Sequence, residues 1–221
     1  DVYKRQNIMS QNKTNFAVPL AFVGMMFFAI GFALGINSFL IPVLKGALSL
    51  PSGVAYLLLA ATFVPFLIFG YPASATIAKI GYKRTMALSF LIFAVAFILF
   101  VLSAKLENFI LFLIASFVSG AANAYLQASV NPYITILGPI ESAAKRMSIM
   151  GICNKLAWPV APLFFALVVA DQTNVQTSDL YLPFYIIIGV FLLLGIISLM
   201  APLPEVKAAG EDESDTANCP Y

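Results

Sequence analysis

Long apolar stretches recur along the chain, separated by short polar or turn-forming links. A helix needs about 20 apolar residues to cross about 30 Å of hydrocarbon. Six stretches meet this requirement, and we predict membrane-spanning helices at 17–42, 54–78, 85–104, 108–137, 147–170 and 181–201. The apolar run LLLAATFVPFLIFG lacks the polar–apolar alternation of a transmembrane barrel strand. The predicted fold class is therefore an all-α membrane protein with six transmembrane helices.

Both ends of the sequence differ from this apolar middle. Residues 1–16 read as a cytoplasmic leader, in which 1–8 precede the first Met and are interpreted as a non-native remnant. The first apolar stretch is too long for a cleavable signal peptide, so we expect it to act as a signal anchor. The six-helix region covers 17–204, and we interpret 205–221 as an acidic cytoplasmic linker that is truncated.

The basic residues predict the orientation in the membrane. With a cytoplasmic N-terminus, the cytoplasmic set beyond residue 8 is Lys13, Lys79, Lys83, Arg84, Lys145, Arg146 and Lys207. The opposite side then holds Lys45 and Lys105. The positive-inside rule therefore predicts that both termini are cytoplasmic.

Composition excludes several classes of protein. The 221 residues are 61% hydrophobic and 10% charged, whereas globular domains are about 25% charged. Mean hydropathy is +0.94, and a net charge of +2 gives no field for binding nucleic acid. His is absent, and the two Cys, one in an apolar run and one in the polar tail, predict no disulfide. Because the spans hold no carboxylate, His or metal-ligand cluster, we expect no enzyme, metal or cofactor.

Polar side chains inside a span are costly and are therefore candidates for function. In the fourth span Asn123, Gln127 and Asn131 are spaced by four, so they lie along one helix face with a drift of about 40° per step. Amides both donate and accept, so this row suits the hydroxyls of a polar, uncharged solute. The alternative is hydrogen bonding between helices, worth about 0.6–2 kcal/mol, and spacing alone leans towards that role.

Lys155 is the one charged residue well inside a predicted span. It lies nine residues beyond Arg146, or about 13 Å along a helix. Its ammonium group either snorkels to the cytoplasmic interface or faces a wet cavity and pairs with a substrate or a polar helix. The two interpretations are nearly balanced.

The link between the second and third spans, GYPASATIAKIGYKRTMALS, resembles the signature loop of the major facilitator superfamily. The matching residues are Gly70, Gly81, Lys83 and Arg84. The resemblance implies a cytoplasmic gate built from this basic cluster, with Lys79 and Arg146 beside it. The usual Asp is absent, since Ala75 and Lys79 stand where an acid is expected, so the latch is expected to be weaker.

A second resemblance is more specific. The run ASVNPYITILGPIESAAKRMSIMGICNKLAWPVAPLF at 128–164, with INSFLIPVLK at 36–45, resembles the fucose–galactose–glucose:proton symporter family of that superfamily. The similarity extends from about residue 20 to residue 204. It implies the N-terminal six-helix half of a twelve-helix transporter, whose C-terminal six-helix half is missing here.

Departures from the family pattern concern ion coupling. Asn37 matches, but Ser38 stands where the family has an Asp that takes part in proton or sugar handling. Gln127 occupies a position that is Glu in some members, and Lys155 follows the matching Asn154 where a small residue is usual. Neither Ser nor Gln titrates near the working pH, so coupling must rest on the missing half or on another ion.

The resemblance implies secondary active transport of a hexose-type sugar (fucose, glucose or galactose) across the inner (plasma) membrane, coupled to a proton or sodium ion. The expected sugar-binding amides are Asn37, Asn123, Gln127, Asn131 and Asn154. Trp158, the single Trp, either stacks on a sugar face, anchors at the membrane interface or packs. Two alternatives stay open: a transporter of another polar or acidic solute that pairs with Lys155, and a self-contained six-span channel.

Overall fold

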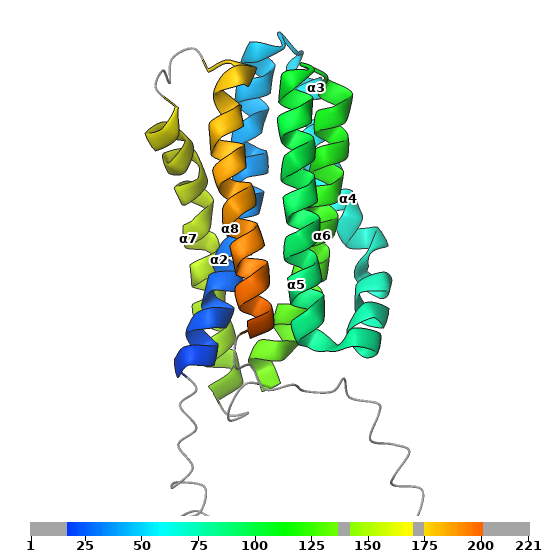
Figure 1. Cartoon of the computed structure of the whole chain (residues 1–221), viewed down its shortest axis with the longest axis vertical. Coiled ribbons are helices and arrows are strands. Elements are labelled where there is room, and N and C mark those ends of the chain that lie inside the picture. Colours follow the sequence, from blue (N-terminus) through cyan, green and yellow to red (C-terminus); the bar gives the residue numbers. More distant parts are fainter. Residues whose placement is uncertain (1–16, 137–141, 170–174, 201–221) are drawn as a thin grey trace, which may run out of the picture.

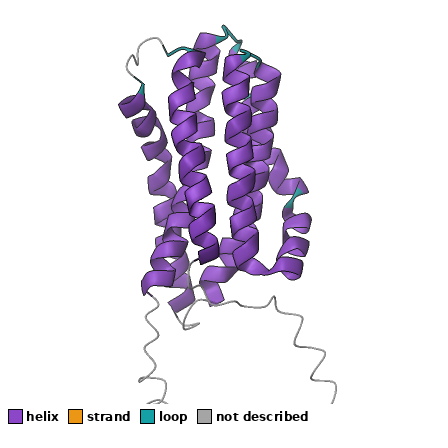
Figure 2. Ribbon diagram, viewed as in Figure 1, coloured by secondary structure: helices purple, strands orange, loops and turns teal. Residues whose placement is uncertain are grey.

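The computed structural model describes residues 17–136, 142–169 and 175–200, and throughout these residues the regular elements are helices (Figure 1, Figure 2). The leader 1–16 and the linker 205–221 lie outside the described residues. In chain order the elements are α2 (Ala17–Ala47), α3 (Ser52–Ala55), α4 (Leu57–Ile68), α5 (Gly70–Lys105), α6 (Phe109–Ile136), α7 (Ala143–Val168), η2 (Thr177–Leu180) and α8 (Tyr181–Met200).

The six predicted crossings map onto these elements. Within the described residues, five helical segments are long and apolar enough to span a bilayer, and they include α2, α5, α6, α7 and α8. A sixth, shorter apolar stretch is Ser52–Ile68. This stretch and the first part of α5 form the second crossing, and the rest of α5 forms the third. The predicted all-α membrane fold is confirmed.

The second crossing is broken, so the prediction of one continuous helix over 54–78 is wrong. Helix α4 ends at Ile68, and α5 begins at Gly70 after a bend at Phe69. Pro72 explains the break, because a proline lacks the N–H for an intrahelical bond and its ring clashes with the carbonyl four residues earlier, here that of Ile68.

The turn between the second and third crossings is a single glycine rather than a longer loop. The segment KIGYKR is helical on both sides of Gly81, whose φ is 81° and ψ is 168°. This backbone region is open essentially to glycine. The chain therefore reverses direction at Gly81. The sequence predicted a link of six residues here, and only Gly81 among them has a non-helical backbone.

Successive crossings run in alternating directions. As a result α2 begins and α8 ends at the same end of the bundle, the lower end in Figure 1. The bend within α5 and the start of α7 lie at this end too. The segments predicted to form the cytoplasmic gate are therefore gathered at one end.

An aromatic core joins α5 to α8 and α7. Phe93 of α5 stacks on Phe191 of α8 with ring centroids 4.8 Å apart, and Phe100 stacks on Phe184 at 5.5 Å. Phe165 of α7 meets Phe184 edge-on at 6.0 Å. All five rings are buried. Such pairs add about 0.5–1.5 kcal/mol each beyond their buried area, so they fix α8 in place.

Two other helix pairs approach each other backbone to backbone. A Cβ added at Gly31 of α2 would lie 1.9 Å from the carbonyl oxygen of Asn154 in α7, and one at Gly35 would lie 2.7 Å from that of Trp158. Likewise, a Cβ at Gly120 of α6 would lie 2.1 Å from the carbonyl oxygen of Thr62 in α4. Lipid gives little hydrophobic drive for association between helices, so such close van der Waals packing carries it.

Arg146 ties the end of α6 to the start of α7. Its side chain is 8% exposed and donates to the carbonyl oxygens of Ile134 and Thr135, each at 3.2 Å. It also donates to the hydroxyl of Ser142. The last carbonyls of a helix have no intrahelical partner and carry partial negative charge, so a guanidinium group is well matched to them.

Gly31→Ala in the full-length protein should lower the thermal unfolding midpoint in detergent. The added methyl group overlaps the Asn154 carbonyl, and overpacking of this kind costs about 1–3 kcal/mol. Gly46→Ala on the same helix is the matched control, because a Cβ there meets nothing within 4 Å. Equal midpoints for the two variants would contradict close packing at Gly31.

Arg146→Met should also lower the thermal midpoint, because it leaves the carbonyl oxygens of Ile134 and Thr135 without their donor. The expected loss of unfolding free energy is about 1–3 kcal/mol. The neighbouring exposed Lys145 provides the control, and Lys145→Met should have little effect. Thermal unfolding of both variants measures the difference. A loss as large for Lys145→Met would show that charge, rather than capping, is responsible.

Candidate solute site

Asn37 is fully buried at the contact of α2 with α6. Its Nδ2 donates to the carbonyl oxygen of Ala33 at 3.1 Å and to the hydroxyl oxygen of Ser119 at 3.3 Å. Its Oδ1 has no hydrogen-bond partner among the described residues. Asn37 therefore joins two helices with its donor side, while its acceptor side is unused.

Asn123 is fully buried one turn beyond Ser119 on the same face of α6. Neither its Nδ2 nor its Oδ1 has a partner among the described residues, and the hydroxyl of Ser116 on this face also has none. We call Asn37, Ser116, Ser119 and Asn123 the amide seam. A buried polar group without a partner costs about 1–3 kcal/mol, so the seam holds hydrogen-bonding capacity that the packing of this half does not use.

Gln127 and Asn131 continue the same stripe towards the end of α6. Their spacing places them on the face that carries Asn123, and both are only partly buried. The stripe therefore runs from the closed centre of the bundle to a more open position. The structure brings Asn37 and Asn123 into one seam, with Gln127 and Asn131 as its extension along α6.

Ser38, where the resemblance implies an Asp in the family, is bonded within its own helix. Its hydroxyl donates to the carbonyl oxygen of Leu34 at 3.1 Å. This is the usual arrangement of a Ser inside a membrane helix.

Asn154 links α7 to α2 rather than standing free. Its Nδ2 donates to the carbonyl oxygen of Phe27 at 3.1 Å, and its own carbonyl lies against Gly31. Hydrogen bonding between helices, the alternative left open for the amide row of the fourth span, is thus observed for Asn154 of α7. For Asn37 it accounts for the donor side alone.

Lys155 and Trp158 form a pair on α7. The Lys155 Nζ lies 5.1 Å from the centroid of the Trp158 ring, within the range of a cation–π contact. Such a contact is worth about 0.5–2 kcal/mol, less than the cost of about 2.5–3.5 kcal/mol for a charge at the bilayer centre. Trp158 Nε1 is buried and has no partner among the described residues.

The turn at Gly81 and the start of α7 place most of the predicted gate residues at the lower end of the bundle, but Gly70 lies eleven residues before this turn. Gly81 makes the turn, and Lys83 and Arg84 follow it at the start of the third crossing. Arg84 borders a groove of about 320 Å³ between α5 and α8. Gly70 starts α5, with open space around it. Arg146 differs from these residues because its side chain binds carbonyl oxygens at the end of α6.

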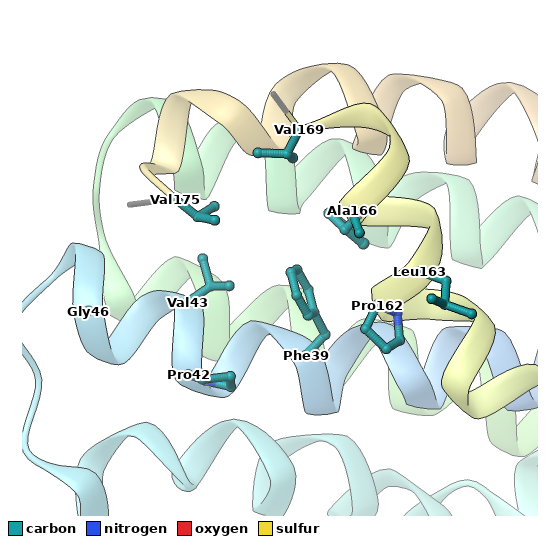
Figure 3. Close-up of a pocket in the computed structure, with 10 residues that line it drawn as sticks. Phe39, Pro42, Val43, Gly46, Pro162, Leu163, Ala166, Val169 and Val175 are labelled. Carbon is teal, nitrogen blue, oxygen red and sulfur yellow. The ribbon is translucent and has the colours of Figure 1, made fainter. Parts of the chain in front are cut away.

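One cavity in the structure was not predicted from the sequence. A cavity of about 580 Å³ opens between the upper ends of α2 and α7 (Figure 3). Its lining is apolar and includes Phe39, Pro42, Val43, Pro162, Ala166 and Val169. The two prolines were visible in the sequence, but apolar residues at helical spacing give no sign of a hollow. None of the predicted amides lines it.

No group of three or more His, Cys, Asp or Glu side chains that could hold a metal ion occurs in the part of the chain that the structure describes. The acidic residues in those ranges are Glu107, between α5 and α6, and Asp179, in η2. Glu107 accepts a hydrogen bond from Thr177, and Asp179 accepts one from the backbone of Gln176. Chemistry at the seam therefore rests on amides and hydroxyls.

Known proteins with similar sequences are sugar transporters. The chain is 31% identical over 209 residues to the glucose/galactose transporter of Brucella abortus biovar 1 (strain 9-941), covering 92% of this chain and 50% of that protein. It is 22% identical over 220 residues to the L-fucose-proton symporter of Escherichia coli (strain K12), covering 90% and 50%. The chain thus spans about half the length of the curated relatives it matches.

A solved structure has the same fold. The crystal structure of FucP, a major facilitator superfamily transporter in the outward conformation, matches with a TM-score of 0.72 at 23% identity, covering 86% of this chain and 51% of FucP. The resemblance inferred from the loop and helix motifs is confirmed. The sequence model of the Major Facilitator Superfamily matches residues 22–219. The chain therefore belongs to this superfamily and corresponds to the N-terminal six-helix half of its transporters.

Proposed function

We propose that the full-length protein is a secondary transporter that moves a hexose-type sugar across the inner membrane by alternating access. The observation that carries this proposal is the 31% identity over 92% of the chain to a glucose/galactose transporter. The amide seam supports it, because amides and hydroxyls are the groups that bind sugar hydroxyls. In this scheme solute binds near the midplane between two six-helix halves, which rock around it.

The amides divide into two roles. Asn123 and the acceptor side of Asn37 have unused hydrogen-bonding capacity and are assigned to the sugar, together with Gln127 and Asn131 further along α6. Asn154 contributes mainly by holding α7 against α2, since its amide already donates to Phe27. The Trp158 side chain is assigned to packing against the hydrophobic core and to its contact with Lys155.

Ion coupling is assigned to the other half of the transporter. One relative is named an L-fucose-proton symporter, which supports a proton as the coupling ion. The six spans of this chain contain no Asp or Glu, and Ser38 and Gln127 cannot carry a proton near neutral pH. A proton carrier must therefore lie in the C-terminal half, or a sodium ion must replace the proton.

The gate is assigned to the cytoplasmic end. Gly81 makes a turn that only glycine adopts readily, and Lys79, Lys83 and Arg84 surround it. With both termini cytoplasmic, as the distribution of basic residues predicts, the lower end in Figure 1 faces the cytoplasm.

A transporter of an acidic solute is the second candidate, favoured by the mid-span charge of Lys155. Uptake of labelled glucose, galactose and fucose into proteoliposomes containing the full-length protein distinguishes the two. We expect saturable uptake that excess neutral hexose blocks and excess uronic acid does not. Blocking by uronic acid alone would favour the acidic solute. Uptake unaffected by imposed proton and sodium gradients would indicate facilitated diffusion.

Asn123→Leu should lower sugar uptake while leaving the fold intact. Loss of one neutral hydrogen bond to sugar, about 0.5–1.5 kcal/mol, should raise KM by about 2- to 10-fold. The thermal midpoint should stay the same or rise, because an apolar side chain of similar size replaces a buried amide without a partner.

Two control variants make this test specific. Asn154→Leu should lower the midpoint, because it removes a bond between α7 and α2. Ser129→Ala on α6 should change neither quantity, since its hydroxyl donates only within its own helix, to Tyr125. A lowered midpoint with unchanged KM for Asn123→Leu would assign Asn123 to the fold instead of the sugar.

A further inference from the structure

Lys155 lies at the middle of a membrane-spanning helix. It is the thirteenth of the 26 residues of α7, a helix about 39 Å long. Along the helix it lies about 13 Å from Arg146 and about 20 Å from Val168. Its ammonium group lies 5.1 Å from the centroid of the Trp158 ring, whose residue is one turn further along α7. A charge held at this depth is stable only with a partner or with water.

The face of α7 around Lys155 is exposed and otherwise apolar. Ile152, Leu156 and Leu163 are each about three-fifths exposed, and Leu167 is 88% exposed. In the most apolar window of α7, 17% of the residues are buried, against 33–56% in the other long helices. Among the described long helices, α7 thus has the most surface left to cover.

Other exposed faces of the bundle differ in one respect. On α5 the exposed residues Leu91, Val95, Ile98 and Leu102 form a stripe without a charge, and α8 carries a similar stripe from Leu182 to Ile196. Such stripes suit lipid. A stripe of the same kind with a lysine at its centre does not, because an intramembrane charge needs a partner or water.

We propose that the Lys155 face of α7 packs against a transmembrane helix of the transporter's other half, and that this helix bears an Asp or Glu that pairs with Lys155. The inference goes beyond sugar transport and does not depend on which solute is carried. About half the length of the relatives lies outside this chain, so the covering segment is available in the full-length protein.

Charge complementarity favours a carboxylate-bearing helix of the other half as the segment that covers this face. A second copy of this chain would bring another Lys155 and no intramembrane carboxylate, because its spans contain none. A sugar would bind where hydrogen-bonding groups gather, and the exposed large side chains beside Lys155 on this face are Ile152 and Leu156. A carboxylate on an apolar helix matches both the charge and its surroundings.

A charge exchange in the full-length protein tests the pairing. Lys155→Asp should reduce the yield of folded protein, measured by size-exclusion chromatography in mild detergent, at least 10-fold, because two carboxylates would then face each other. Each Asp or Glu in the spans of the second half is next changed to Lys in this background. One of these double variants should restore the yield to at least half that of the unaltered protein. The readout is assembly, so a failure of sugar transport would leave it interpretable.

Spin labelling of single cysteines gives a second measurement that needs no misfolded variant. Cys153, Cys219 and every cysteine of the second half are replaced by Ala, and a nitroxide at Lys155→Cys should then be shielded from dissolved oxygen in lipid membranes. A nitroxide at Val95→Cys, on the uncharged stripe of α5, is the matched control and should have a several-fold higher oxygen accessibility.

The remaining outcomes would overturn the proposal. Failure of every double variant to restore the yield, or a normal yield for Lys155→Asp alone, would exclude the ion pair. Rapid labelling of Lys155→Cys by a charged, membrane-impermeant reagent, with protection by sugar or uronic acid, would place Lys155 in the solute pathway. An oxygen accessibility equal to that at Val95→Cys would place it in lipid.

Discussion

Close contact between helix backbones is the constraint on which the rest of the structure depends. At Gly31 and Gly35 the α2 backbone lies against the carbonyls of Asn154 and Trp158, and at Gly120 α6 lies against α4. A side chain at any of these positions would push the helices apart. The same contacts set the register of the polar residues, since Asn154 reaches Phe27 and Asn37 reaches Ser119 only at this spacing. Packing and the solute site therefore share one origin.

The hydrogen bonds distinguish the polar side chains that stabilise the fold from those that are available to bind solute. Ser38, Thr62 and Ser129 all donate to the carbonyl four residues earlier, and none is left without a partner. Asn123 uses neither end of its amide, although it is fully buried. In an apolar medium that cost is not recovered by packing. The unused capacity is concentrated in the amide seam, which is why the proposed sugar site is centred there.

Much of the fold could be predicted from the sequence, because apolar length is the strongest signal that a membrane chain carries. The number and order of crossings followed from it, and the loop around Gly81 indicated the superfamily. The break at Phe69 was missed, although Pro72 was visible, since prolines are often tolerated in membrane helices. The division among the amides could not be predicted either. Spacing puts Asn123, Gln127 and Asn131 on one face but cannot show which of them has a partner.

Lys155 shows how the surface of a half-transporter differs from that of a complete one. Exposed apolar residues alone cannot distinguish lipid from a covering helix, because both are apolar. A charge can, since the contact with Trp158 offsets only part of its cost at mid-depth. The exposed stripes of α5 and α8 carry no charge and suit lipid, whereas the exposed α7 face carries Lys155, which under our proposal a helix of the other half covers. The asymmetry of charge over the three helices thus indicates where this half meets the rest of the transporter.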